Sequence, residues 1–143
     1  MKKTFKAQIA HGTTNTIRLS TNNGLTGYKI HKFQMMDNAP AANSNEFILK
    51  VFTIKPTAVN GTVNFDDPTL IASGFMAGNT DTRYDVLQTV IFDDVVFNQD
   101  IYVTCYDQNG SNGTCNFYLE LAQVKLDLNE ATVATLKDMR GRE

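Results

Sequence analysis

The chain of 143 residues contains only two cysteines, three prolines and no tryptophan. Two cysteines are too few for a disulfide framework, so the fold must depend on a hydrophobic core, and a chain of this length can build one. No apolar run approaches the roughly 18 residues of a membrane-spanning helix, so we expect no membrane partner. Residues 1–3 resemble the start of a secretory signal, but Lys6 and Gln8 interrupt the apolar segment that would have to follow. This predicts a strand there and folding in the cytoplasm.

Charge and catalytic motifs are also sparse. Thirteen Lys and Arg against fifteen Asp and Glu give a formal net charge of -2, which offers no electrostatic basis for direct nucleic-acid binding. His11 and His31 are the only histidines, and neither stands near a recognisable nucleophile motif. No glycine-rich phosphate loop is present. The sequence therefore predicts a protein that is not an enzyme and needs no cofactor.

Short segments of alternating apolar and polar residues dominate the chain, and turn residues (Asn, Gly, Asp, Thr and Pro) separate them. The predicted strands are 5–9, 17–20, 28–36, 46–55, 70–75, 86–92, 95–97 and two segments within 100–126. Eight or nine antiparallel strands with one short helix predict a single all-β domain over residues 1–143. We expect a jelly-roll-like β-sandwich, because the chain is long for an immunoglobulin-like sandwich and lacks its tryptophan.

The segment Asp100–Leu126 predicts a β-hairpin, and one pairing register makes a whole face of that hairpin apolar. Cys105 opposite Cys115 would give one wholly apolar face, with the further pairs Val103–Phe117 and Ile101–Leu119. The two thiols could form a disulfide, since opposed strand residues have a suitable Cα separation. Alternatively they stay reduced as small buried hydrophobes, which is usual for cytoplasmic proteins.

The end of the chain predicts one helix over about residues 128–140. Asp127 and Glu130 form a capping box that would start it. Val133 and Leu136 lie at helical spacing and make a narrow apolar stripe. Such a helix could dock on its own sandwich or on a neighbouring subunit.

Several apolar and aromatic residues are predicted to face away from the core. The second face of the predicted hairpin carries tyrosines, and the strand 46–55 is apolar on both sides. A small sandwich with such surplus apolar surface usually hides it in a partner, although a helix or adjacent strand could also cover it. The interface candidates are Phe47, Phe52, Tyr102, Tyr106, Tyr118, Val133 and Leu136.

Acidic pairs offer the only candidate metal ligands. Asp66, Asp67, Asp93 and Asp94 could bind Ca²⁺, which prefers carboxylate oxygens, and paired acids could also serve glycoside hydrolysis. Solvated turns are the simpler interpretation. The turn 107–113 resembles a calcium loop only superficially, because asparagine stands at its glycine position and tyrosine at its final glutamate position. We therefore expect no metal centre.

The C-terminal third reads VIFDDVVFNQDIYVTCYDQNGSNGTCNFYLELAQVKLDLNEATVATLKDMR. Its strand with Asp-Asp, its DIYVT strand, its Gly/Asn/Ser turn and its closing helix resemble the ends of small structural proteins of environmental bacteriophages. The resemblance implies a virion subunit (capsid, decoration or tail-associated) that is made in the host cytoplasm and binds itself and other virion proteins. The alternative is a carbohydrate- or receptor-binding module, perhaps assisted by calcium. A third is an enzyme on the same fold, since fold does not set function.

Overall fold

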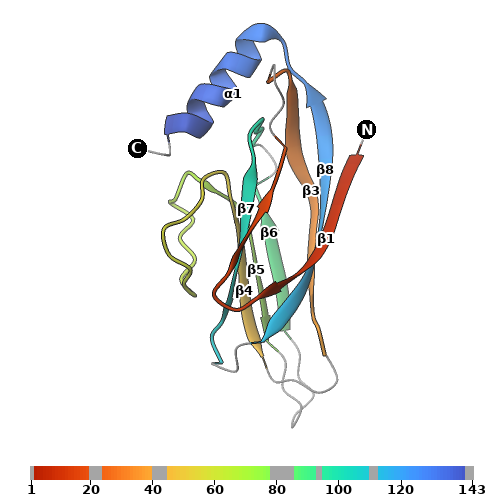
Figure 1. Ribbon diagram of the computed structural model, residues 1–143, viewed down its shortest axis with the longest axis vertical. Coiled ribbons are helices and arrows are strands. Elements are labelled where there is room, and N and C mark those ends of the chain that lie inside the picture. The colour runs from red at the N-terminus through yellow and green to blue at the C-terminus, as the bar shows by residue number, and fades with distance from the viewer. Residues whose placement is uncertain are drawn as a thin grey trace.

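The computed structural model describes residues 2–19, 24–39, 45–77, 86–92, 95–109 and 113–140 (Figure 1). Eight strands and one helix account for most of them, which confirms the predicted all-β sandwich. The elements are β1 (Lys2–Ala10), β2 (Thr14–Ile17), β3 (Thr26–Asp37), β4 (Glu46–Phe52), β5 (Leu70–Ala77), β6 (Val86–Ile91), β7 (Ile101–Asp107), β8 (Thr114–Lys125) and α1 (Leu128–Arg140).

The strands form two antiparallel sheets that pack face to face. The three-stranded sheet has the order β1-β8-β3, and the five-stranded sheet has the order β2-β7-β4-β5-β6. A jelly roll orders its sheets as β1-β8-β3-β6 and β2-β7-β4-β5. The chain therefore has jelly-roll order except at β6, which is bonded to β5 and leaves β3 at the edge of the smaller sheet.

The core lies between the sheets and is built by alternation along each strand. Inward residues of β4 and β7 meet inward residues of β3 and β8, and the largest fully buried side chains include Phe33, Phe47, Leu49, Phe97, Leu119 and Leu121. Strand β4 is buried on both faces because it lies in the middle of its sheet and a loop covers its outer side. That explains its near-continuous apolar sequence.

The predicted hairpin between residues 100 and 126 is wrong. Strands β7 and β8 lie in different sheets: β7 pairs with β2 and β4, and β8 pairs with β1 and β3. Cys105 pairs with Leu49, whereas Cys115 pairs with Ile9 and Asp37. The two apolar faces do meet, but across the sandwich and not side by side. Alternation fixes which residues face inward and leaves the pairing partner undetermined.

Residues 95–97 do not form a ninth strand. Within the described residues, this segment makes a single bridge, in which the Phe97 N–H and C=O exchange hydrogen bonds with Tyr28 at 3.0 and 2.8 Å. The bridge lies at the outer edge of β3. It places the next residue, Asn98, at the end of the sandwich where the helix docks.

The C-terminal helix docks on its own sandwich, which is one of the two contacts expected for it. Its Ala131 and Ala134 pack with Leu126 in a small apolar cluster that also contacts Leu25 and Val96. The predicted capping box is confirmed at its first bond, since the Glu130 N–H donates to Asp127 Oδ1 at 2.7 Å. Figure 1 shows α1 lying across one end of the sandwich.

Candidate functional site

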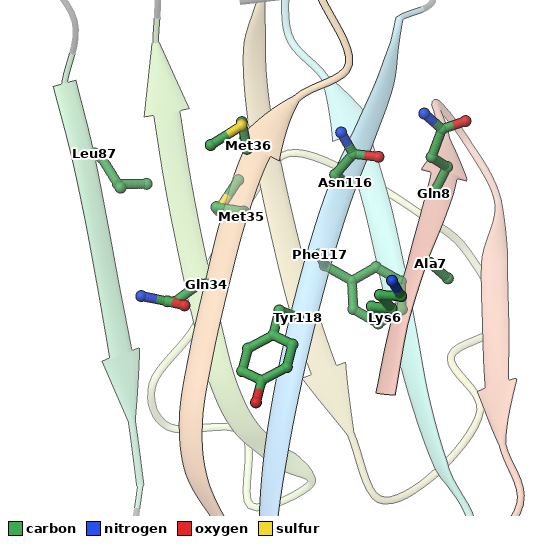
Figure 2. A pocket seen from close by; sticks show the side chains of 10 residues that line it. All are labelled: Lys6, Ala7, Gln8, Gln34, Met35, Met36, Leu87, Asn116, Phe117 and Tyr118. Atoms are coloured by element: carbon green, nitrogen blue, oxygen red, sulfur yellow. The ribbon is translucent and has the colours of Figure 1, made fainter. Parts of the chain in front are cut away.

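The outer face of the three-stranded sheet carries a groove of about 620 Å³ (Figure 2). The strand register sets side chains of β1, β8 and β3 in rows across the sheet. One row is Lys6–Tyr118–Gln34, and the next is Gln8–Asn116–Met36. Inward-facing Ala7, Met35 and Phe117 also line the groove, and Leu87 of β6 completes it at the edge of the sandwich.

The row beside the groove is charged. Glu120 forms an ion pair with Lys2, in which Oε1 lies 2.8 Å from Nζ. The hydroxyl of Tyr118 donates a hydrogen bond to the second carboxylate oxygen, Oε2, at 3.1 Å. The hydrogen bond from Lys2 holds the pKa of Glu120 below its ordinary value. Desolvation, together with the bond to Glu120, raises the pKa of the Tyr118 phenol. Tyr118 therefore stays a neutral hydroxyl with a fixed orientation.

This groove offers hydrogen-bonding and apolar groups side by side. Gln8, Gln34 and Asn116 supply amides that donate and accept, and Tyr118 supplies an aromatic ring. Met36 is 60% exposed and Leu87 is 59% exposed, so the rim is apolar. Such a surface suits noncovalent binding of a polar ligand that has an apolar side, or of another protein.

The three tyrosines do not share one surface, so the predicted single tyrosine face is wrong. Tyr118 lies on the outer face of the smaller sheet, whereas Tyr102 and Tyr106 lie on the outer face of the larger sheet. This follows directly from the separation of β7 and β8. The tyrosines thus face opposite sides of the molecule, and only Tyr118 borders the groove.

The loop 53–69 crosses Tyr106 and Phe52 on the outer face of the larger sheet. A Cβ placed on Gly61 would lie 3.0 Å from the ring of Tyr106, which shows how closely the loop 53–69 crosses it. Phe52 is 8% exposed beneath the same loop, and Phe47 is fully buried in the core. The predictions of Phe47 and Phe52 as interface residues are therefore wrong. The surplus apolar surface of β4 is covered within the subunit.

Lys50 connects the loop 53–69 to the sheet through hydrogen bonds. Its side chain stands on the outer face of β4 but is only 5% exposed, and its ammonium donates to Asn60 Oδ1 at 3.0 Å and to the Thr62 carbonyl at 2.8 Å. Burial lowers the pKa of Lys50, and the nearby charge of Asp67 partly offsets this effect. Two loop acceptors thus compensate a charge that lies beneath the loop.

The helix presents the other predicted interface residues to solvent. Val133 is 65% exposed and Leu136 is 51% exposed, and Leu128 at the first turn is 74% exposed. Among the described side chains of α1, the small residues Ala131 and Ala134 pack on the sandwich, and Thr135 accepts a hydrogen bond from Asn98. The helix therefore uses its alanines for its own sandwich and leaves its larger aliphatic residues available.

The acidic candidates lie in turns. Asp67 Oδ1 accepts the backbone N–H and the hydroxyl of Thr69 at 2.9 and 2.7 Å, and Asp66 is exposed beside it. Asp93 and Asp94 lie outside the described residues. In the part of the chain that the structure describes, no group of three or more His, Cys, Asp or Glu side chains is arranged to hold a metal ion.

The two cysteines are free and fully buried. Burial raises the pKa of each thiol to about 12, with a smaller contribution from Asp107 at Cys105 and from the Cys105 charge at Cys115. They behave as the reduced core residues that one sequence interpretation described. The disulfide alternative is not present in the structure.

The two histidines also have ordinary surroundings. His11 Nδ1 accepts a hydrogen bond from the Asp107 N–H at 2.8 Å, and the centroid of its ring lies 4.8 Å from that of Tyr106. His31 is exposed, and its Nε2 lies 3.9 Å from Glu120 Oε1.

None of the helical segments described is long and apolar enough to span a membrane.

Most of the groove residues were not identified from the sequence. Alternation along β3 places Gln34 and Met36 outward, but nothing local indicates that Lys6 and Gln8, more than 20 residues earlier, lie in the same rows. Leu87 was missed because it lies on a strand of the other sheet. Only the order of the strands in the two sheets shows that these residues line one groove.

No protein-family model matches the chain, and the search of curated proteins found no match.

Proposed function

We propose that this protein is a non-enzymatic structural subunit of a bacteriophage virion, a capsid or capsid-decoration protein that acts by associating with copies of itself and with other virion proteins. The proposal depends on one observation about α1: its small residues contact the sandwich and its large aliphatic residues face solvent. The helix is anchored on its own sandwich through alanines and exposes Leu128, Val133 and Leu136. Large exposed aliphatic residues on a surface helix are typical of a protein–protein contact.

The architecture and the sequence agree with this role. A jelly-roll-like sandwich offers sheet edges, faces and end surfaces to neighbours, so one subunit can make several different contacts. The resemblance of the C-terminal third to phage structural proteins adds the specific assignment to a virion. Assembly would depend on apolar contact more than on charge, because the exposed helix residues are aliphatic.

Light scattering after size-exclusion chromatography, followed by electron microscopy, tests the association. We expect the apparent mass of the wild type to rise with concentration. The double variant Val133→Glu/Leu136→Glu should lower this association at least tenfold, because charged side chains resist desolvation. The matched control is Asn129→Glu, a charge of the same type at an exposed polar position of the same helix. A wild type that stays a monodisperse monomer at every concentration and forms no particles would contradict the proposal.

The groove on the three-stranded sheet favours a second candidate, a carbohydrate- or receptor-binding module. Its tyrosine and amides could stack on and hydrogen-bond to a sugar ring. Glycan-array binding that is lost in Tyr118→Ala and retained in Tyr102→Ala would support this function, since the two tyrosines lie on opposite faces. Repeating the array with and without Ca²⁺ would show whether calcium assists.

A further inference from the structure

Within the described part of the chain the sandwich has four edge strands, and three of them are protected against pairing with another chain. β1 carries Lys2, Lys3 and Lys6, and β2 is only four residues long. β3 contains Lys29 and Lys32 and has an irregularity in its register between Ile30 and Lys32. Charge, shortness and irregularity are the usual devices that keep edge strands from pairing.

The fourth edge, β6, has none of these devices. Its sequence is VLQTVI, without charge or proline, and its register against β5 is regular over its whole length. Valine, isoleucine, leucine and threonine also favour extended backbone. Among the residues that the structure describes, β6 pairs only with β5, and Figure 2 shows it beyond β5 on the outer side of the sheet.

The hydrogen-bonding pattern shows which backbone groups are available. The Phe92 N–H donates to the Ile71 carbonyl at 3.0 Å, so even-numbered residues here direct their backbone groups toward β5. Leu87, Thr89 and Ile91 must then direct their N–H and C=O groups toward the free edge. These three residues form a regular ladder of donors and acceptors.

We propose that β6 pairs antiparallel with β6 of a second copy of this chain, which joins the two five-stranded sheets into one continuous sheet across a two-fold axis. This inference rests on the proposed self-association and adds a second surface to it, beside the exposed side of α1. A two-fold axis through Thr89 places Thr89 opposite itself and Leu87 opposite Ile91, so all three outward-directed residues find partners. An axis through Gln88 would leave Ile91 without one.

A second copy fits this edge because the edge is self-complementary. An uncharged strand meets no like-charge repulsion when it faces itself, and its partner offers donors where it has acceptors. The pairing also brings Leu87, which is 59% exposed, against an apolar residue of the partner strand. The rim of the groove around Met36 would then lie close to the new contact, because Leu87 lines the same groove.

Cross-linking through Thr89→Cys tests the register. In a hydrogen-bonded antiparallel pair the opposed Cα atoms lie about 5.5 Å apart, within the range for a disulfide. We expect mild oxidation to give a covalent dimer on a non-reducing gel, while Thr4→Cys, at an exposed position of β1 outside the groove, gives none. The native thiols do not compete, because both are fully buried.

Thr89→Lys and Thr89→Pro test the energetics from two directions. The lysines of two copies would face each other at the axis, and proline removes an N–H that β5 does not use. Each should weaken self-association at least tenfold, whereas Thr4→Lys, at an exposed position of β1 outside the groove, should not. If the wild type associates, but both variants associate equally well and Thr89→Cys does not cross-link, the β6 contact is wrong and the proposed function stands. If neither wild type nor Thr89→Cys associates at any concentration, both are wrong.

Discussion

Asn98 is joined to Thr135 by a hydrogen bond of 2.8 Å from Nδ2 to Oγ1, and this contact links the body of the sandwich to the C-terminal helix. The same amide also approaches the carbonyl oxygens of Gly24 and Ala131, at 3.1 and 3.4 Å. Asn98 is fully buried. One side chain therefore orients the helix whose exposed side carries the proposed assembly residues.

Replacing this asparagine should loosen the helix. We expect Asn98→Ala to lower the free energy of unfolding by about 1–3 kcal/mol, because buried acceptors lose their donor. Hydrogen exchange should become faster in α1 than in the sheets. Asn129→Ala, at an exposed position of the helix, is the matched control and should change little. Equal exchange in α1 of both variants would show that Asn98 does not anchor the helix.

The assignment of faces on β8 gives a prediction about stability. Phe117 is buried between the sheets and Tyr118 points outward, so Phe117→Ala should destabilise the subunit by about 3–5 kcal/mol through lost burial and a cavity. Tyr118→Ala should destabilise it less. Urea unfolding followed by circular dichroism measures both. An equally large loss for the two variants is the result that this face assignment does not permit.

The buried thiols predict a loss of stability at alkaline pH. Their pKa in the folded protein is raised from 9.0 to about 12, so the folded protein keeps protons that the unfolded chain releases. Their contribution is complete below about pH 9 and is lost as the pH rises toward about 12. Comparison of urea unfolding of the wild type and Cys115→Ala should show a steeper alkaline decline in the wild type. Parallel declines would contradict the raised pKa.

The buried lysine predicts a local effect. Lys50→Ala should release the loop 53–69, because the Asn60 side chain and the Thr62 carbonyl both lose their donor. Limited proteolysis should then cleave this loop faster than in the wild type, while the rest of the sandwich stays resistant. Lys55→Ala, an exposed lysine in the same loop, serves as the control. If Lys50→Ala is cleaved at the wild-type rate, the hydrogen bonds of Lys50 do not hold the loop 53–69 in place.

Local sequence patterns determined the elements of this protein. Alternation identified the strands because inward side chains must be apolar, and it placed Val103, Cys105 and Phe117 in the core correctly. The capping residues Asp127 and Glu130 located the start of the helix, because capping depends only on residues within one turn. Helical spacing placed Val133 and Leu136 on one stripe, but it did not show that this stripe is exposed and that the alanines dock instead.

Only the tertiary structure decided which strands are neighbours. The sequence pattern of β7 and β8 satisfies a hairpin and a sandwich equally well, since both bury the same faces. Three further features followed from that choice: the separation of Tyr102 from Tyr118, the burial of Phe52 beneath a loop, and the assembly of the groove around Tyr118. Each depends on contacts between residues far apart in the chain, and such contacts leave no periodic signal in the sequence.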